Sequence, residues 1–332
     1  QTGSVIIIKN SVNSTISNLT ITGGLETYGG GMLLFKSNPI LNNLTISKNT
    51  AVSSGGGILL QESNPTLTNI TISGNRANAH GGGIYLLQES NPTFSNMIIS
   101  ENIADSLGGG IVLQKSNPNL FNVTISGNTA NIHGGGIFFI QSNPNLSNMT
   151  ISGNTANIHG GGIVLLYSNP ILAYITLSDN TAGFLGGGVL LQESNPTLTN
   201  ITISGNRADS LGGGIYLFIS NPTLTNTIIW DNRPESIYLH SDETPIITYS
   251  DIEVDISWVG IGNINFNPLF TDSLSGDYSL QAHSPCIDAG TAYFVQEAEE
   301  YFDSNENSIY DYAELFADLN GNGVWDEAEE YV

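Results

Sequence analysis

The stretch GGGILLQESNPTLTNITISGN, residues 55–75, decides the fold because the chain repeats it. The triplet Gly-Gly-Gly starts at residues 29, 55, 81, 108, 134, 160, 186 and 212. The triplet Ser-Asn-Pro starts at residues 37, 63, 90, 116, 142, 168, 194 and 220. The period is therefore 26 residues, with one extra residue within Ile84–Glu89. An earlier run, Val5–Ile8 followed by Thr15–Ile21, has the character of a ninth, degenerate copy.

Each copy has the pattern of short strands and no helical period. Apolar Leu67, Ile70 and Ile72 alternate with Thr and Ser, and Gly, Asn and Pro bound the apolar runs as turn formers. Three short strands and three turns in 26 residues make one coil, which must stack on its neighbours to close a core. Nine coils at a strand spacing of about 4.8 Å predict a rod of roughly 40 Å.

Three columns of asparagine recur at the period of the repeat. Since Asn tolerates left-handed turns and stacked amides bond to one another, we expect three ladders at the corners, with their side chains inward. The columns are Asn38, Asn64, Asn91, Asn117, Asn143, Asn169, Asn195 and Asn221; Asn43, Asn69, Asn96, Asn122, Asn148, Tyr174, Asn200 and Asn226; and Asn49, Asn75, Asn102, Asn128, Asn154, Asn180, Asn206 and Asn232.

These motifs resemble the right-handed parallel β-helix repeat family, within the pectate-lyase-like superfamily. The Gly-Gly-Gly-Ile and Gly-Asn-x-Ala elements are similar to the repeats of polymorphic outer-membrane proteins. The segment Asn263–Gly290 resembles the tail that closes many secreted bacterial β-helices. The resemblance covers about residues 4–290 and implies an all-β, right-handed parallel β-helix. It leaves activity open, because the family contains lyases, hydrolases, adhesins and structural proteins.

The charge of the chain changes abruptly. Residues 1–234 hold 9 acidic and all 7 basic residues, whereas residues 235–332 hold 21 acidic residues and no Lys or Arg. We predict β-helix repeats in 1–234, final coils and a closing segment in 235–290, and an acidic tandem EF-hand-like module in 291–332. The net charge of −23 argues against nucleic acid or anionic lipid as a partner, and no apolar run is long enough to insert into a membrane.

The solenoid lacks the residue clusters that polysaccharide-cleaving relatives are expected to use. Arg76 and Arg207 share a column but lie five coils apart, and Asp105 and Asp209 lie four coils apart. We therefore expect no enzymatic activity. His80, His133 and His159 precede Gly-Gly-Gly in a column that also holds leucines. The last two could share a metal, although a turn position that accepts Leu or His alike is the simpler interpretation.

One outer face is predicted to be rich in hydroxyl groups. The simplest interpretation is that these side chains only cover the outer face of the strands. An attached glycan, a partner contact or ice binding are the alternatives. Asn-x-Ser/Thr sequons recur along the chain, most of them by-products of the asparagine columns, whose side chains we expect to be unavailable. The hydroxyl columns are Thr45, Thr71, Thr124, Thr150, Thr176 and Thr202, beside Ser47, Ser73, Ser100, Ser126, Ser152, Ser178 and Ser204.

The acidic tail contains two loops with the ligand spacing of calcium-binding EF-hands. Oxygen ligands at positions 1, 3, 5, 9 and 12 and the carbonyl of position 7 surround a hard cation. The pair resembles dockerin-like and other extracellular calcium modules, and the first loop has Ser308 where Gly is usual. The predicted Ca²⁺ ligands are Asp303, Asn305, Asn307, Ile309, Asp311 and Glu314, then Asp318, Asn320, Asn322, Val324, Asp326 and Glu329.

From these features we expect a secreted structural protein, exposed on the cell surface or outside the cell. The chain opens at Gln1 directly into a strand-like run, which fits a mature secreted protein or an excised fragment. The leading hypothesis is head-to-tail self-assembly into a calcium-stabilised filament, because a solenoid has two open ends. A monomeric adhesin, spacer or module that binds surface or matrix glycans is the alternative, and a polysaccharide lyase or hydrolase is third.

Overall fold

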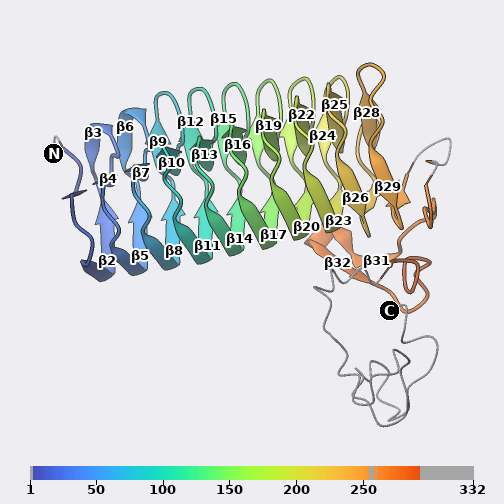
Figure 1. The fold of residues 1–332 in the computed structure, drawn as a ribbon, viewed down its shortest axis with the longest axis horizontal. Helices are drawn as coiled ribbons and strands as arrows, with labels where there is room; N and C mark the ends of the chain where they lie inside the picture. The colour runs from blue at the N-terminus through green and yellow to red at the C-terminus, as the bar shows by residue number, and fades with distance from the viewer. Residues whose placement is uncertain (1–2, 254–257, 259, 292–332) are drawn as a thin grey trace, which may run out of the picture. The chain divides into compact units, whose positions relative to one another are not determined.

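The fold was analysed in a computed structural model, which describes residues 3–253, 258 and 260–291. The chain divides into two compact units, Gln1–Ala289 and Gly290–Val332. The first unit is a stack of coils built from three parallel sheets (Figure 1). Each regular coil contributes one strand to each sheet, and hydrogen-bonded neighbours are one repeat apart in the sequence. The third sheet ends at β24, so the described residues of the last coils add no strand to it. The expected all-β parallel solenoid is confirmed, with ten strands in its first sheet rather than about nine.

The strands of the first sheet follow the triple glycines. They are β1 (Ile6–Lys9), β4 (Met32–Phe35), β7 (Ile58–Gln61), β10 (Ile84–Leu87), β13 (Ile111–Gln114), β16 (Ile137–Ile140), β19 (Ile163–Leu166), β22 (Val189–Gln192), β25 (Ile215–Phe218) and β28 (Ile237–Leu239).

In the regular coils, the strands of the second sheet follow Ser-Asn-Pro and are eight residues long, and they become shorter from β26 onward. They are β2 (Thr15–Thr22), β5 (Ile40–Ser47), β8 (Thr66–Ser73), β11 (Thr93–Ser100), β14 (Asn119–Ser126), β17 (Asn145–Ser152), β20 (Ile171–Ser178), β23 (Thr197–Ser204), β26 (Thr223–Thr225), β27 (Ile228–Trp230), β29 (Ile246–Thr248) and β30 (Asp251–Ile252).

The third sheet has short strands that precede the glycine corner. They are β3 (Leu25–Tyr28), β6 (Thr50–Ser54), β9 (Arg76–Ala77), β12 (Ile103–Ala104), β15 (Thr129–Ala130), β18 (Thr155–Ala156), β21 (Thr181–Ala182) and β24 (Arg207–Ala208). A separate antiparallel hairpin comprises β31 (Phe270–Asp272), the 3₁₀ turn η1 (Ser273–Ser275) and β32 (Asp277–Leu280). The described residues contain no α-helix, and the predicted calcium-binding loops of the EF-hand-like module lie outside them.

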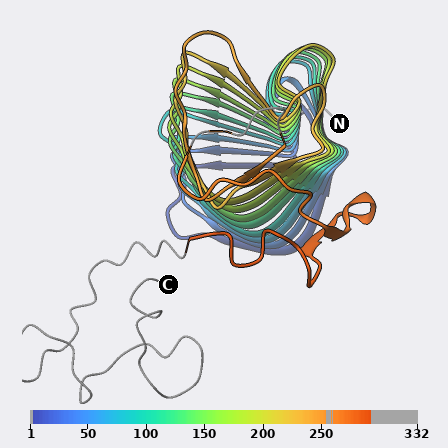
Figure 2. The same ribbon diagram turned by 90° about the vertical axis from the view of Figure 1, so that its right-hand side faces the viewer.

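Seen end-on, the coils superpose around one elongated interior (Figure 2). Leu67, Ile70 and Ile72 of β8 are buried there, and the equivalent residues of neighbouring coils lie above and below them. The buried asparagine column runs beside this core. Asn154 donates its Nδ2 group to Oδ1 of Asn180 at 2.9 Å and to the Ile125 carbonyl oxygen at 2.9 Å. Since each such amide would be costly to bury unpaired, the ladder fixes the register of the coils.

The expectation that all three asparagine columns point inward is wrong for two of them. Asn69 adopts a left-handed conformation with φ of 55° and is exposed, as are most members of its column. The asparagine of Ser-Asn-Pro is also exposed, and its Oδ1 accepts the backbone N–H of the next coil, as Asn38 does from Asn64 at 2.7 Å. Several sequon asparagines, including Asn43 and Asn122, therefore lie on the surface.

The triple glycine allows close stacking at its corner. A Cβ atom on Gly56 would lie 2.4 Å from the carbonyl oxygen of Gly82 and 2.5 Å from that of Arg76. Both oxygens belong to the backbone of the next coil, so neither can move aside. The corner therefore needs glycine at position 56 because there is no space for a side chain. It needs glycine at position 55 because the backbone there has a positive φ of 72°.

A second hydrophobic cluster covers the outer side of the first sheet. Leu59 on β7 and Phe138 on β16 point away from the main core but are 3% exposed. Side chains of the turn before the triple glycine, such as Leu107 and Leu185, pack against this cluster. The sequence signal is the unbroken apolar run after each triple glycine, which is typical of a strand buried on both faces.

Candidate functional site

The antiparallel hairpin of residues 270–280, called the strap here, lies over the outer face of the second sheet (Figure 1). Asp272 caps the 3₁₀ turn by accepting hydrogen bonds from the backbone N–H of Ser275 at 3.3 Å and from its hydroxyl at 2.7 Å. Gly276 then reverses the chain with φ of 80°. Phe270 packs edge-on against Tyr278, with ring centroids 5.1 Å apart, which fixes the tyrosine ring within the hairpin.

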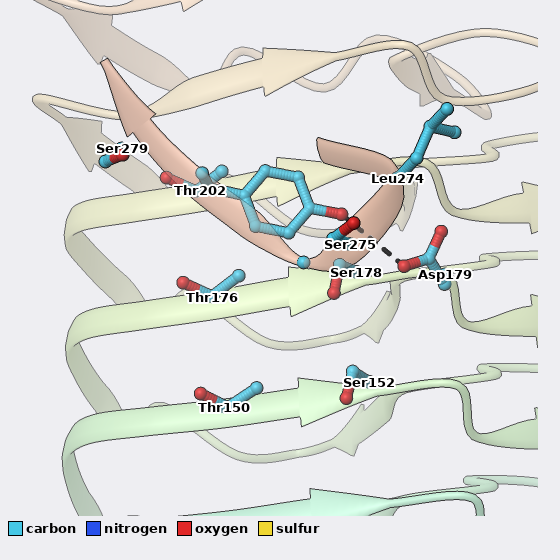
Figure 3. A pocket seen from close by; sticks show the side chains of 11 residues that line it. Thr150, Ser152, Thr176, Ser178, Asp179, Thr202, Leu274, Ser275 and Ser279 are labelled. Carbon is cyan, nitrogen blue, oxygen red and sulfur yellow. Dashed lines mark hydrogen bonds between the residues drawn. The ribbon is translucent and has the colours of Figure 1, made fainter. Parts of the chain in front are cut away.

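A pocket of about 490 Å³ lies between the strap and three successive strands of the solenoid. Its floor consists of the outward hydroxyls of β17, β20 and β23, which stack one coil apart (Figure 3). The volume is within the range of about 300–1,000 Å³ that is usual for small-molecule sites. The lining residues are Thr150, Ser152, Thr176, Ser178, Asp179, Thr202, Leu274, Ser275, Gly276, Tyr278 and Ser279.

Asp179 and Tyr278 join the two sides of the pocket. The Tyr278 hydroxyl donates a hydrogen bond to Oδ2 of Asp179 at 3.4 Å, drawn as a dashed line in Figure 3. Burial raises the pKa of Asp179, although the bond from Tyr278 acts in the opposite direction. Burial also raises the pKa of Tyr278, and the negative charge of Asp179 adds to that effect. The Tyr278 phenol therefore stays neutral at neutral pH and donates its hydrogen bond to the Asp179 carboxyl group.

The pocket can form many hydrogen bonds but has one ionisable acid among its described lining residues. Each hydroxyl both donates and accepts, so the site suits a ligand that carries hydroxyl groups of its own. Asp231, two coils beyond Asp179, influences its pKa but does not line the pocket. The Asp231 carboxylate instead accepts a hydrogen bond from the Arg233 guanidinium at 3.1 Å.

The described arginines are all held by carboxylates. Arg76 pairs with Asp105 across one coil at 2.6 Å, and Arg207 pairs with Asp209 at 3.3 Å. Arg76 and Arg207 begin β9 and β24, which are five positions apart in the third sheet as the repeat predicts. Arg207 and Arg233 are neighbours on adjacent coils, which the repeat spacing alone did not predict because the last coils are irregular. None of these arginines lines the hydroxyl pocket.

The three histidines lie beside the second hydrophobic cluster. His133 and His159 stack with centroids 4.9 Å apart and planes 6° from parallel, which confirms that they occupy adjacent coils. Their Nδ1 atoms, and that of His80, are buried without a hydrogen-bond partner among the described residues. Burial and the neighbouring His159 imidazole lower the pKa of His133 to about 4, so it is neutral at pH 7. Because the ring planes are parallel, the two nitrogen lone pairs do not converge on one metal ion.

No three His, Cys, Asp or Glu side chains gather into a possible metal site in residues 3–253, 258 and 260–291. Cys286 donates a hydrogen bond from its thiol to the buried Asp251 carboxylate at 3.0 Å. Burial and the Asp251 carboxylate raise the pKa of Cys286 to about 12, so this sulfur remains a thiol. The predicted calcium ligands between Asp303 and Glu329 lie outside the described residues, and calcium there remains a prediction.

Two family models match the chain. The model described as right handed beta helix region matches residues 4–182, and that described as periplasmic copper-binding protein (NosD) matches residues 108–267. The described side chains do not fit a copper ion, because the stacked histidines do not converge and no donor cluster exists among them. Within the described residues, no helix is long and apolar enough to span a membrane. Neither curated proteins nor solved structures gave a match. With more than half of its length matched, the chain belongs to the right-handed β-helix family.

Proposed function

We propose that the chain is an extracytoplasmic, non-catalytic β-solenoid that binds a neutral saccharide in the pocket beneath the strap. The observation that carries the proposal is the pocket itself, which places five hydroxyls of stacked strands opposite Tyr278 and beside one carboxylate. Saccharides offer hydroxyl groups that both donate and accept hydrogen bonds, which matches this lining. The periplasmic description of the NosD family supports a location outside the cytoplasm.

The charge around the pocket favours a neutral ligand over an acidic one. Asp179 would repel a sugar acid, and no Arg or Lys is among the described residues that line the pocket. Glycoside hydrolysis normally needs a second carboxyl group at the scissile bond, about 5–9.5 Å from the first. The pocket lining supplies Asp179 alone in the described chain, which supports binding without turnover.

Isothermal titration calorimetry with cello-oligosaccharides and malto-oligosaccharides tests the proposal, with oligogalacturonate as the acidic comparison. The Asp179→Gly variant should bind neutral sugars about 10- to 100-fold more weakly, because a hydrogen bond to a charged group contributes about 1.5–3 kcal/mol. Gly153 and Gly205 occupy the same position in the adjacent coils, so this variant keeps the local backbone. Absence of binding to every neutral sugar, or tighter binding of oligogalacturonate, would reject the proposal.

Head-to-tail assembly is a second proposal, supported by the first coil. Leu19 of β2 occupies the core column of Leu44 but is 48% exposed, whereas Leu44 is 2% exposed. A further coil placed against β2 would bury this side chain, and a second copy of the chain can supply one. Sedimentation velocity should show oligomers that grow with concentration and that Leu19→Asp abolishes. A wild-type chain that stays monomeric at every concentration would contradict assembly.

Calcium binding by the acidic tail is also a proposal, and it rests on the spacing of Asp303–Glu314 and Asp318–Glu329 alone. Extracellular modules of this kind bind Ca²⁺ with dissociation constants of about 10⁻⁴–10⁻³ M. Calorimetry on the whole chain should detect two such sites, and the double variant Glu314→Gln and Glu329→Gln should lose both. If the two proteins give the same titration, the proposal fails.

A further inference from the structure

The coil of residues 160–185 departs from the repeat on its outer surface. Tyr174 replaces the asparagine that is found at this position after every other Ser-Asn-Pro triplet. Tyr167 stands where the neighbouring coils have Gln141 and Glu193, and Ile171 stands where they have Asn145 and Thr197. These three side chains are exposed, with 64% of Tyr174 accessible. Larger side chains therefore stand on this coil where the two adjacent coils have polar ones, and Tyr174 alone is without a counterpart in its column.

Tyr174 is poorly suited to its backbone position. It adopts φ of 55°, a left-handed conformation that asparagine tolerates much better than a bulky aromatic residue. A tyrosine also cannot continue the amide bonds of its column, such as the bond from Asn148 to Asn122. The exposed ring is not packed into either hydrophobic cluster. Because the substitution opposes the local rules of the fold, its benefit is expected to lie in binding.

The strand that carries Tyr174 also forms the floor of the pocket. Tyr174 and Thr176 both lie on β20, and Thr176 lines the pocket together with Ser178 at the end of the same strand. Two residues of an extended strand span about 7 Å. Tyr174 therefore lies on the same strand as the pocket floor, two residues before Thr176, where a ligand that extends along β20 beyond the pocket would come within reach of it.

We infer that Tyr174 forms an aromatic subsite for a neutral oligosaccharide whose end occupies the pocket beneath the strap. The inference rests on the proposed function and extends it from a short sugar to a chain that follows β20. A flat, amphipathic ring suits the apolar face of a sugar while its hydroxyl stays in water. Farther along the coil, the Tyr167 hydroxyl is hydrogen-bonded to the Glu193 carboxylate, which disfavours an acidic chain there.

The test compares disaccharides with hexasaccharides by calorimetry. The variant Tyr174→Asn restores the repeat residue, so it should fold at least as well as the wild type. It should bind cellohexaose or maltohexaose about 5- to 20-fold more weakly and should bind the matching disaccharide unchanged. Tyr174→Phe keeps the ring and should retain most of the hexasaccharide affinity. Tyr167→Gln, which restores the residue of the preceding coil, measures how far the subsite extends.

The outcomes separate this inference from the function on which it rests. If Tyr174→Asn binds both lengths like the wild type while Asp179→Gly weakens both, the pocket stands and the aromatic subsite is rejected. If Tyr174→Asn weakens disaccharide and hexasaccharide equally, Tyr174 acts on the pocket as a whole and the separate subsite is also rejected. If the wild type binds no neutral sugar of either length, both proposals fall together.

Discussion

The coils of residues 134–159 and 160–185 are neighbours with nearly the same interior and different exteriors. Inside, Asn154 stacks on Asn180, and Met149 is replaced by the similarly buried Ile175. Outside, Asn148 becomes Tyr174 and Gly153 becomes Asp179. The interior must match above and below to keep every buried amide bonded, whereas water can replace a bond that is lost on the exterior. The comparison teaches that the repeat specifies the fold, and the surface departures at Tyr174 and Asp179 are where we place the proposed binding.

Removing one amide from the buried asparagine ladder should have the largest effect on the stability of the fold. In Asn180→Ala, the backbone N–H and the side-chain Nδ2 of Asn154 lose their shared acceptor, and the Ile151 carbonyl oxygen loses a donor. We expect the free energy of unfolding to fall by about 3–5 kcal/mol, since each buried group left unpaired costs about 1–3 kcal/mol. Chemical denaturation measures the change.

Asn169→Ala, in the exposed column of the same coil, is the control. Asn169 accepts one hydrogen bond, from the backbone N–H of Asn195 at 2.6 Å, and water can replace that acceptor. The loss should stay below about 1 kcal/mol. Equal losses at Asn169 and Asn180 would contradict the distinction between the buried and exposed ladders.

Lowering the pH should reduce the stability of the fold through the histidines beside the second hydrophobic cluster. His133 has a pKa of about 4 in the folded chain, below the value of 6.5 for an unperturbed imidazole. The unfolded chain therefore binds more protons between these values, so stability falls as pH decreases from about 6.5 to about 4. His133→Leu places the residue of its column neighbour Leu107 at this position. Its melting temperature should decline less than that of the wild type over this range, and parallel curves would contradict the assignment.

Restoring the repeat residue on the exterior of the coil of residues 160–185 should have the smallest effect on the free energy of unfolding, and it should raise that energy. Tyr174→Asn removes a bulky residue from a left-handed conformation, which should raise the free energy of unfolding by about 1 kcal/mol. Thermal unfolding would show an increase of a few degrees at most. A destabilised variant would mean that the Tyr174 ring contributes packing to the fold, which would weaken the case for a binding role.

The sequence predicted most of the fold because the repeat is regular. The period and the stacking of the coils follow from spacing, although the first sheet has ten strands where about nine coils were predicted. Spacing does not show that Asn75 points inward while Asn69 points outward. In a regular strand, one residue separates two inward side chains, but two residues separate the inward Leu67 and Ile70. This spacing indicates a left-handed corner at Asn69, whose side chain turns outward. The unbroken apolar run that begins at Ile58 could likewise have indicated the second cluster.

The candidate site was harder to predict because it joins distant segments. Asp179 and Tyr278 are 99 residues apart, and no periodic signal places the strap over β20. The sequence identified the hydroxyl columns and the closing segment separately. Which coils the strap covers depends on the packing of Tyr278 and on the position of Asp179, where the adjacent coils have glycine.

The most direct test of the account is a chemical-shift map of the isotopically labelled protein titrated with the neutral hexasaccharide that it binds. The account predicts that the perturbed amides form one contiguous set, comprising Tyr174–Ser178 on β20, the following Asp179, and Gly276–Ser279 on the strap. The coil of residues 108–133 should remain unperturbed apart from global effects. Perturbations spread evenly over all coils, or concentrated at the histidine column, would contradict it.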